Sequence, residues 1–259
     1  MLASIKQLYQ YRQLLKSNVR KEIRGKYKGS FLGVLWSFVN PLLMTLVYAI
    51  VFPFLLRNGS IPHYTTFIVI AILPWNWFTT CISQGTPTIL HNGGIIKKVF
   101  FPREVLPISI VTSGLVNFLI SCIIICIFLI CSGIGFSFNI LYLPLIIITQ
   151  YIFMLGLILI TSSINVYVRD VEYIVNFIMS MVFYATPILY SIEMFPVRFR
   201  YILRLNPMVT LIESYRNIFY YQVPPNLKYL AFVFIGSCVI LWVGFLVFNK
   251  LQKGFAEEL

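Results

Sequence analysis

The stretch from Val105 to Val168 contains no Asp, Glu, Lys or Arg, and this absence constrains the fold more than any other feature of the sequence. The chain of 259 residues is 59% hydrophobic and 11% charged, with a mean hydropathy of +0.87. A soluble domain of this length does not have such a composition. Unpaired backbone groups are costly in hydrocarbon, so helices of roughly 20 residues are the expected way for this chain to cross a membrane.

Polar breaks divide the apolar blocks and predict an all-α integral membrane protein with six transmembrane helices. The breaks are "RNGSIPH", a charged stretch around residue 100, "SGIGFSFN", "RDVE" and a long segment before the last block. Residues 1–259 form one predicted transmembrane domain, in which residues 250–259 are a cytoplasmic tail. The predicted spans are Phe31–Leu56, Tyr64–Leu90, Val105–Ser132, Leu141–Val168, Tyr173–Tyr190 and Tyr229–Asn249.

Basic residues near the ends of the spans predict which side each loop faces. Lys and Arg are retained on the cytoplasmic side, and residues 1–30 contain many of them against the single acid Glu22. Six spans and this bias place both termini in the cytoplasm and the chain in the cytoplasmic (inner) membrane. The segment Ser191–Lys228 disagrees, because it is rich in Arg but is assigned outside. The assignment follows the stronger signal at the N-terminus.

Residues 1–30 have the pattern of an amphipathic helix. Ile5, Leu8, Leu15 and Val19 follow one another at helical steps, whereas the Lys and Arg side chains fall largely on other faces. The pattern predicts a helix that lies in the membrane interface. Either this helix only anchors the topology, or its basic face also binds the anionic headgroup of a cargo in addition to the headgroups of ordinary lipids.

What the sequence lacks argues against several classes of function. The basic residues are mostly next to the spans, so they suit anionic lipid headgroups and not nucleic acid. All acids fall in flanks or loops, whereas ion-coupled carriers usually place ionisable residues within the bilayer. His63 and His91 are isolated, and the five cysteines lack metal-ligand spacing, so neither a catalytic centre nor a metal site is expected. Without a G-x-x-x-x-G-K-[ST] phosphate loop, the chain is expected to be no enzyme and to take its energy from elsewhere.

The inner loop "HNGGIIKKVFFPREVLP", residues 91–107, is expected to bind another protein. Its two glycines end the preceding helix, and two prolines bracket Arg103-Glu104. A free loop has little reason to expose Phe100 and Phe101 to water, whereas a short helix whose aromatic rings enter a cleft of a partner explains them. The alternative is that both rings dip back into the membrane interface. In a second inner turn, "NVYVRDVEY", Arg169 and Asp170 either pair locally or brace the first contact.

Five stretches carry a family resemblance. They are "RGKYKGSFLGVLWSFVNPLL", "LPWNWF", "FPREVLP", "VYVRDV", and "ATPILY" followed by "LNPM", in this order along the chain. Together they resemble the membrane subunit of ABC-type polysaccharide exporters, the ABC-2 group that includes O-antigen, capsule and teichoic acid permeases. The resemblance covers nearly the whole chain, and the ordered set is more specific than any single motif.

The resemblance implies a homodimer bound to two copies of a separate ATPase. ATP and Mg²⁺ belong to that ATPase, and this chain binds no cofactor. The implied cargo is a polysaccharide, such as O-antigen or a capsule-like glycan, on a polyprenyl-pyrophosphate lipid. The alternatives are a teichoic acid exporter of the same family and a permease for a small lipid or drug.

The resemblance also implies roles for particular segments. The N-terminal helix would be a gate whose Arg20, Arg24 and Lys28 meet the pyrophosphate, and the outer face would carry re-entrant helices at Glu193–Leu205 and Pro207–Tyr221. The implied ATPase-coupling residues are Ile95, Ile96, Lys97, Lys98, Val99, Phe100, Phe101, Arg103, Glu104, Arg169 and Asp170.

Aromatic residues make up 17% of the chain and suit a sugar cargo, because the apolar C–H faces of sugar rings pack on aromatic rings. The alternative is that these rings lie at the membrane interface or fill helix contacts. Two other classes stay open: a transferase or scaffold that needs no nucleotide-binding partner, and a channel or secondary carrier that conducts alone. The candidates for lining the path are Trp36, Tyr48, Trp75, Trp77, Phe78, Tyr184 and Tyr190.

Overall fold

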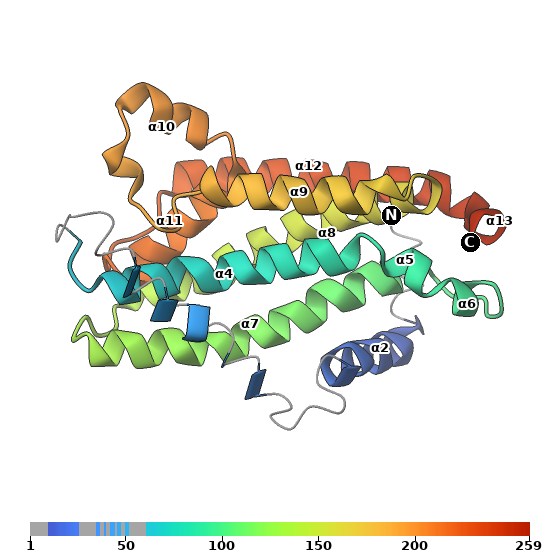
Figure 1. The fold of residues 1–259 in the computed structure, drawn as a ribbon, viewed down its shortest axis with the longest axis horizontal. Coiled ribbons are helices and arrows are strands. Elements are labelled where there is room, and N and C mark those ends of the chain that lie inside the picture. The colour runs from blue at the N-terminus through green and yellow to red at the C-terminus, as the bar shows by residue number, and fades with distance from the viewer. Residues whose placement is uncertain are drawn as a thin grey trace.

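The computed structural model describes residues 10–25, ten of the residues between 35 and 51 (35–36, 39, 42–44, 46–47 and 50–51), and residues 61–259. Every regular element among these residues is a helix (Figure 1). The helices are α2 (Arg12–Gly25), α4 (Tyr64–Gly85), α5 (Thr88–His91), α6 (Gly93–Ile96), α7 (Val105–Cys131), η2 (Phe138–Tyr142), α8 (Leu143–Tyr167), α9 (Asp170–Tyr184), η3 (Ile192–Met194), α10 (Val197–Leu203), α11 (Pro207–Phe219), α12 (Leu227–Leu251), η4 (Gln252–Gly254) and α13 (Phe255–Glu258).

Four of the described helical stretches are long and apolar enough to cross a membrane. They contain 22, 27, 30 and 32 residues and are Tyr64–Gly85, Val105–Cys131, Phe138–Tyr167 and Leu227–Glu258. This finding confirms an all-helical, multi-pass membrane protein over the described residues. The predicted first span, Phe31–Leu56, lies mostly outside the described residues, as do Lys28 and Tyr48.

Two predicted spans have different bounds in the structure, and a proline explains each difference. The predicted span Tyr64–Leu90 is interrupted after Gly85, and Pro87 precedes the separate helix α5. The predicted span Tyr173–Tyr190 is helical only to Tyr184. Pro187 lacks the N–H that a continuing helix needs. At 15 residues, α9 is only about 22 Å long at 1.5 Å per residue.

The long helices lie side by side along the longest axis of the molecule (Figure 1). One end carries α5, α6 and α13, and is called here the α6 end. The opposite end carries α10 and the start of α11, and is called the α10 end. Helix α2 packs against α7 toward the α6 end, and α11 packs against α4, α8 and α12.

Among the described helices, α8 and α12 share the most extensive contact, and glycines make their close approach possible. A Cβ on Gly156 of α8 would lie 2.7 Å from the backbone N of Leu241, and one on Gly244 of α12 would lie 2.7 Å from the Gly156 carbonyl oxygen. Small residues at such contacts let two helix backbones pack closely, which stabilises helix pairs within a membrane. The two backbones are therefore in direct contact at this crossing.

A buried polar chain ties α11 into the bundle. Gln150 of α8 is fully buried and donates a hydrogen bond to the Pro74 carbonyl of α4 at 2.9 Å. The Tyr215 hydroxyl of α11 in turn donates to Gln150 Oε1 at 3.0 Å. A buried amide needs such partners, because leaving it unpaired is costly. The three helices α4, α8 and α11 are thus fixed relative to one another.

Candidate functional site

A hollow of about 490 Å³ lies between α4 and α9. On α4 it is lined by Asn76, Thr79 and Ser83, which share one helix face because they are three and four residues apart. On α9 it is lined by Asn176 and Ser180, four residues apart. The Ser83 hydroxyl donates a hydrogen bond to Asn176 Oδ1 at 2.6 Å. Amide and hydroxyl groups therefore face one another across two mostly apolar helices.

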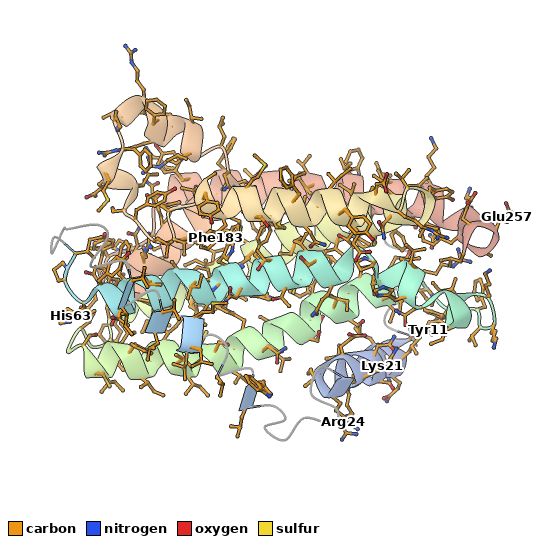
Figure 2. The ribbon with its side chains drawn as sticks, viewed as in Figure 1. Tyr11, Lys21, Arg24, His63, Phe183 and Glu257 are labelled. Atoms are coloured by element: carbon orange, nitrogen blue, oxygen red, sulfur yellow. The ribbon has the colours of Figure 1, made fainter. Side chains whose placement is uncertain are left out.

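The half of this hollow nearer the α10 end is aromatic. Trp75 of α4 and Phe183 of α9 meet edge to face, with ring centroids 5.8 Å apart, and Phe183 contacts Tyr184 at 5.3 Å. Figure 2 labels Phe183 on α9. None of the described residues that line the hollow is charged, and the remaining ones are Met44, Ile72 and Met179. Uncharged hydrogen-bonding groups beside aromatic rings suit a neutral polyhydroxy chain, which presents both hydroxyls and C–H faces.

A second hollow of about 430 Å³ adjoins the first toward the α6 end, and Ser83 lines both. Charged and titratable side chains surround it, among them Lys21 and Glu22 of α2, His91 of α5 and Glu172 of α9. Lys21 Nζ donates a hydrogen bond to Asn92 Oδ1 at 3.3 Å, which ties α2 to the turn between α5 and α6. The polarity therefore falls along one continuous surface, from charged at the α6 end to aromatic near the α10 end.

The predicted lining aromatics separate into three groups. Trp75 and Tyr184 line the hollow between α4 and α9. Trp77 stacks on Phe118 of α7 at 4.8 Å, and Phe78 stacks on Phe153 of α8 at 5.8 Å. Both Trp77 and Phe78 thus fill helix contacts, which is the alternative that the sequence left open. The Tyr190 hydroxyl donates to the Tyr184 carbonyl, and neither Tyr190 nor the half-buried Trp36 lines this hollow.

Sequence reasoning missed the polar residues of this hollow, although a signal for them exists. Asn76, Thr79 and Ser83 form one stripe within a span whose other residues are mostly apolar. A search for polar residues at helical spacing within each span would have found both this stripe and the Asn176–Ser180 pair. The search for aromatic residues instead selected two rings that pack between helices.

Arg20 and Arg24 lie on α2, on the exposed side of a separate hollow of about 460 Å³ between α2 and α7. The cations Lys16, Arg20 and Arg24 are four residues apart, so they share one helix face. The apolar side chains Leu15, Val19 and Ile23 line the same hollow. Figure 2 shows Lys21 and Arg24 on this helix.

Loop 93–104, between α5 and α7, contains nine of the predicted coupling residues, and the structure separates their side chains. Phe100 is 91% exposed, whereas Phe101 is 7% exposed and belongs to the hydrophobic core. Ile95 and Val99 are exposed beside Phe100, together with Lys97 and Lys98. Ile96 and Glu104 are buried. The outward surface therefore consists of one large ring, two aliphatic side chains and two cations.

Arg169 and Asp170 lie in the turn between α8 and α9, which is also at the α6 end, and both are exposed. Asp170 and Glu172 fall in the first turn of α9, where acidic side chains stabilise the positive end of the helix dipole. The segment 252–259, formed by η4 and α13, contacts Arg103 of the loop and Tyr167 at the end of α8, as described below.

At the α10 end, Arg216 of α11 is a buried cation that the sequence analysis did not single out. It is 3% exposed. Its guanidinium donates hydrogen bonds to the carbonyls of Pro187, Ile188 and Tyr190 at 2.5, 2.7 and 3.3 Å. It also lies 3.5 Å from the centroid of the Phe67 ring. The turn that follows α9 is thus held onto α11 and α4 by one side chain.

A family model described as "ABC-2 type transporter" matches residues 13–220. An O-antigen export system permease protein RfbA of Myxococcus xanthus is 36% identical over 261 residues, which cover 100% of both chains. One from Klebsiella pneumoniae is 37% identical and covers 95% of each chain. The capsule polysaccharide export inner-membrane protein CtrC of Neisseria meningitidis is 21% identical over 95% of this chain and 94% of its own length. The resemblance drawn from the sequence is thereby confirmed, and the chain belongs to the ABC-2 type transporter family.

Proposed function

We propose that this chain is the membrane subunit of an ATP-driven exporter that moves polyprenyl-pyrophosphate-linked polysaccharide, of the O-antigen kind, across the cytoplasmic membrane. The observation that carries the proposal is the uncharged polar and aromatic hollow between α4 and α9. The names of the relatives agree with this cargo. A separate ATPase would supply the energy through ATP and Mg²⁺.

The proposed topology has six crossings and a cytoplasmic α6 end. The first crossing would come from residues 31–56. The fifth would consist of α9 together with the turn at residues 185–191, in which Thr186, Ile188 and Leu189 are buried. Irregular backbone is tolerated at membrane depth where protein covers it. Helices α10 and α11 would be the outer re-entrant pair, and α2 the interface helix whose Arg20 and Arg24, with Lys28, meet the pyrophosphate.

A second copy of the chain would complete the path. Helix α9 is largely exposed along its length, and its exposed side chains include Tyr173, Phe177, Met181 and Tyr184. The hollow between α4 and α9 is therefore one wall of a path and not a closed tunnel. A homodimer that faces two such walls toward one another encloses a polymer.

The proposal is tested by purifying the chain with its ATPase in vesicles and adding lipid-linked polysaccharide. ATP turnover and polymer export are both expected to rise with the polymer. Ser83→Trp places a bulky ring where the two hollows adjoin and is expected to lower export by about tenfold or more. Ile123→Trp places the same ring on an exposed face of α7 and is expected to export normally. Failure of the wild-type chain to associate with any ATPase would overturn the proposal.

The outward surface of loop 93–104 gives a second test. Because Phe100 is exposed, Phe100→Ala is expected to leave the unfolding transition unchanged. If Phe100 enters a cleft of the ATPase, its loss weakens association by on the order of 2 kcal/mol, or about 30-fold in Kd. Phe101→Ala instead removes a buried ring and is expected to lower the stability. Equal association of Phe100→Ala and wild type, measured by fluorescence titration of the ATPase, would exclude a docking role for this ring.

A further inference from the structure

Arg103 joins loop 93–104 to the segment 252–259. Its guanidinium Nη1 donates a hydrogen bond to the Gln252 carbonyl. The same guanidinium lies 5.7 Å from the centroid of the Phe255 ring, within the range of a cation–π contact. Arg103 therefore faces inward to its own chain, whereas Lys97 and Lys98 of the same loop are exposed.

The segment 252–259 packs against both α8 and α12. Phe255 is fully buried, and its ring lies 5.6 Å from Phe248 of α12 and 6.3 Å from Tyr167 of α8. The Tyr167 hydroxyl donates to the Leu251 carbonyl at 2.8 Å. On the loop side, the Leu259 side chain lies against Gly93, where an added Cβ would be 3.3 Å from Leu259 Cδ2. Figure 1 shows α13 beyond the end of α12, and Figure 2 places Glu257 there.

We propose that the segment 252–259 is a brace that joins loop 93–104 rigidly to α12 and to the end of α8. The inference rests on the proposed function, in which the ATPase moves this loop. Without the brace, a push on the loop would reach α5 and α7, its two neighbours in the chain, but would not reach α12 directly. With the brace, the same push also reaches α12. Because α12 and α8 touch backbone to backbone at Gly156 and Gly244, this pair moves as one unit.

Arg103 and Phe255 are then positioning residues, and their loss is expected to separate ATP hydrolysis from export. For Arg103→Met, ATPase association and ATP turnover are expected to stay near wild type, while export per ATP hydrolysed falls about fivefold or more. Arg103→Lys keeps a donor and a cation and is expected to recover much of the loss. Arg198→Met makes the same substitution at an exposed arginine of α10 and is expected to leave export per ATP unchanged.

The outcomes separate the brace from the proposed function. If the wild-type complex does not export, the proposed function fails. If it exports and Arg103→Met matches wild type, the brace fails. A loss of association in Arg103→Met as large as that in Phe100→Ala also overturns the brace, because Arg103 would then belong to the docking surface.

A cross-link tests the rigidity directly and does not depend on a destabilising substitution. A Cβ at position 93 would lie 3.5 Å from Leu259 Cβ, which suits a disulfide, for which about 3.5–4.5 Å is usual. Gly93→Cys with Leu259→Cys, in a chain whose five native cysteines are replaced, is expected to form the bond under mild oxidation. Export by the oxidised and the reduced protein is expected to be equal. Failure to cross-link would show that the loop and the segment are not held together. Export that stops on oxidation and returns on reduction would show that they part during transport. Either result overturns the brace.

Discussion

Replacing Arg216 by methionine is expected to lower the free energy of unfolding by about 3 kcal/mol or more. The guanidinium donates to three carbonyls of the turn after α9. Methionine fills part of the volume but donates nothing, so three backbone carbonyls are left without this donor, at about 1 kcal/mol or more each. The contact with the Phe67 ring is lost as well. The loss is measured by unfolding the purified chain in mixed micelles with increasing SDS.

Arg198→Met is the matched control, because Arg198 is an exposed arginine on α10. It is expected to unfold like wild type. The expected defect of Arg216→Met is also local, so proteolysis of the folded protein should become faster within residues 185–191. Arg216→Lys is expected to recover only part of the stability, because one ammonium group cannot span three carbonyls as a planar guanidinium does. Wild-type stability of Arg216→Met would show that the turn does not need this clamp.

Gly156→Ala is expected to cost about 2 to 3 kcal/mol, although it adds a single methyl group. The added Cβ would lie 2.7 Å from the backbone N of Leu241. A backbone atom cannot rotate away as a flexible side chain can, so α8 and α12 must move apart and lose their close packing. The same SDS unfolding experiment measures this loss, and export by the folded fraction should fall with it.

Gly236→Ala on α12 is the matched control, because a Cβ there meets nothing within 4 Å. It is expected to be neutral. Gly244→Ala adds its Cβ 2.7 Å from the Gly156 carbonyl oxygen, at the same crossing. Once one alanine has moved the helices apart, the second costs less, so the double variant is expected to lose less than the sum. Strict additivity would mean that the two glycines do not share one contact.

The sequence predicted the bounds of three long helices closely, and it predicted the helix that begins at Pro207. Helices α7, α8 and α12 begin and end within two residues of the predicted spans. Their apolar blocks are bordered by polar residues, and hydrophobicity alone sets such bounds. Helix α9 was predicted too long, because apolar residues continue through Pro187 to Tyr190 while the helix does not. The predicted span also joined α5 to α4, because apolar residues continue past Pro87 to Leu90 while the helix is interrupted after Gly85.

The candidate site was predicted less well, because residue type does not show which other residues a side chain contacts in the folded protein. Trp75 and Trp77 are two residues apart on one helix, yet one lines the hollow and the other stacks on Phe118. Phe100 and Phe101 are adjacent, yet one is exposed and the other belongs to the core. Residue type predicted that these rings line the path or bind the ATPase. It did not predict which way each side chain points.

The sequence by itself determined that this chain is a helical membrane protein with a basic, exposed loop 93–104. Those properties follow from the solvent that each segment prefers, and each segment carries that preference alone. Only the tertiary structure decided that Ser83 faces Asn176, that Arg216 holds the turn after α9, and that Arg103 reaches the segment 252–259. Each of these contacts joins residues far apart in the chain, and the packing of whole helices brings them together.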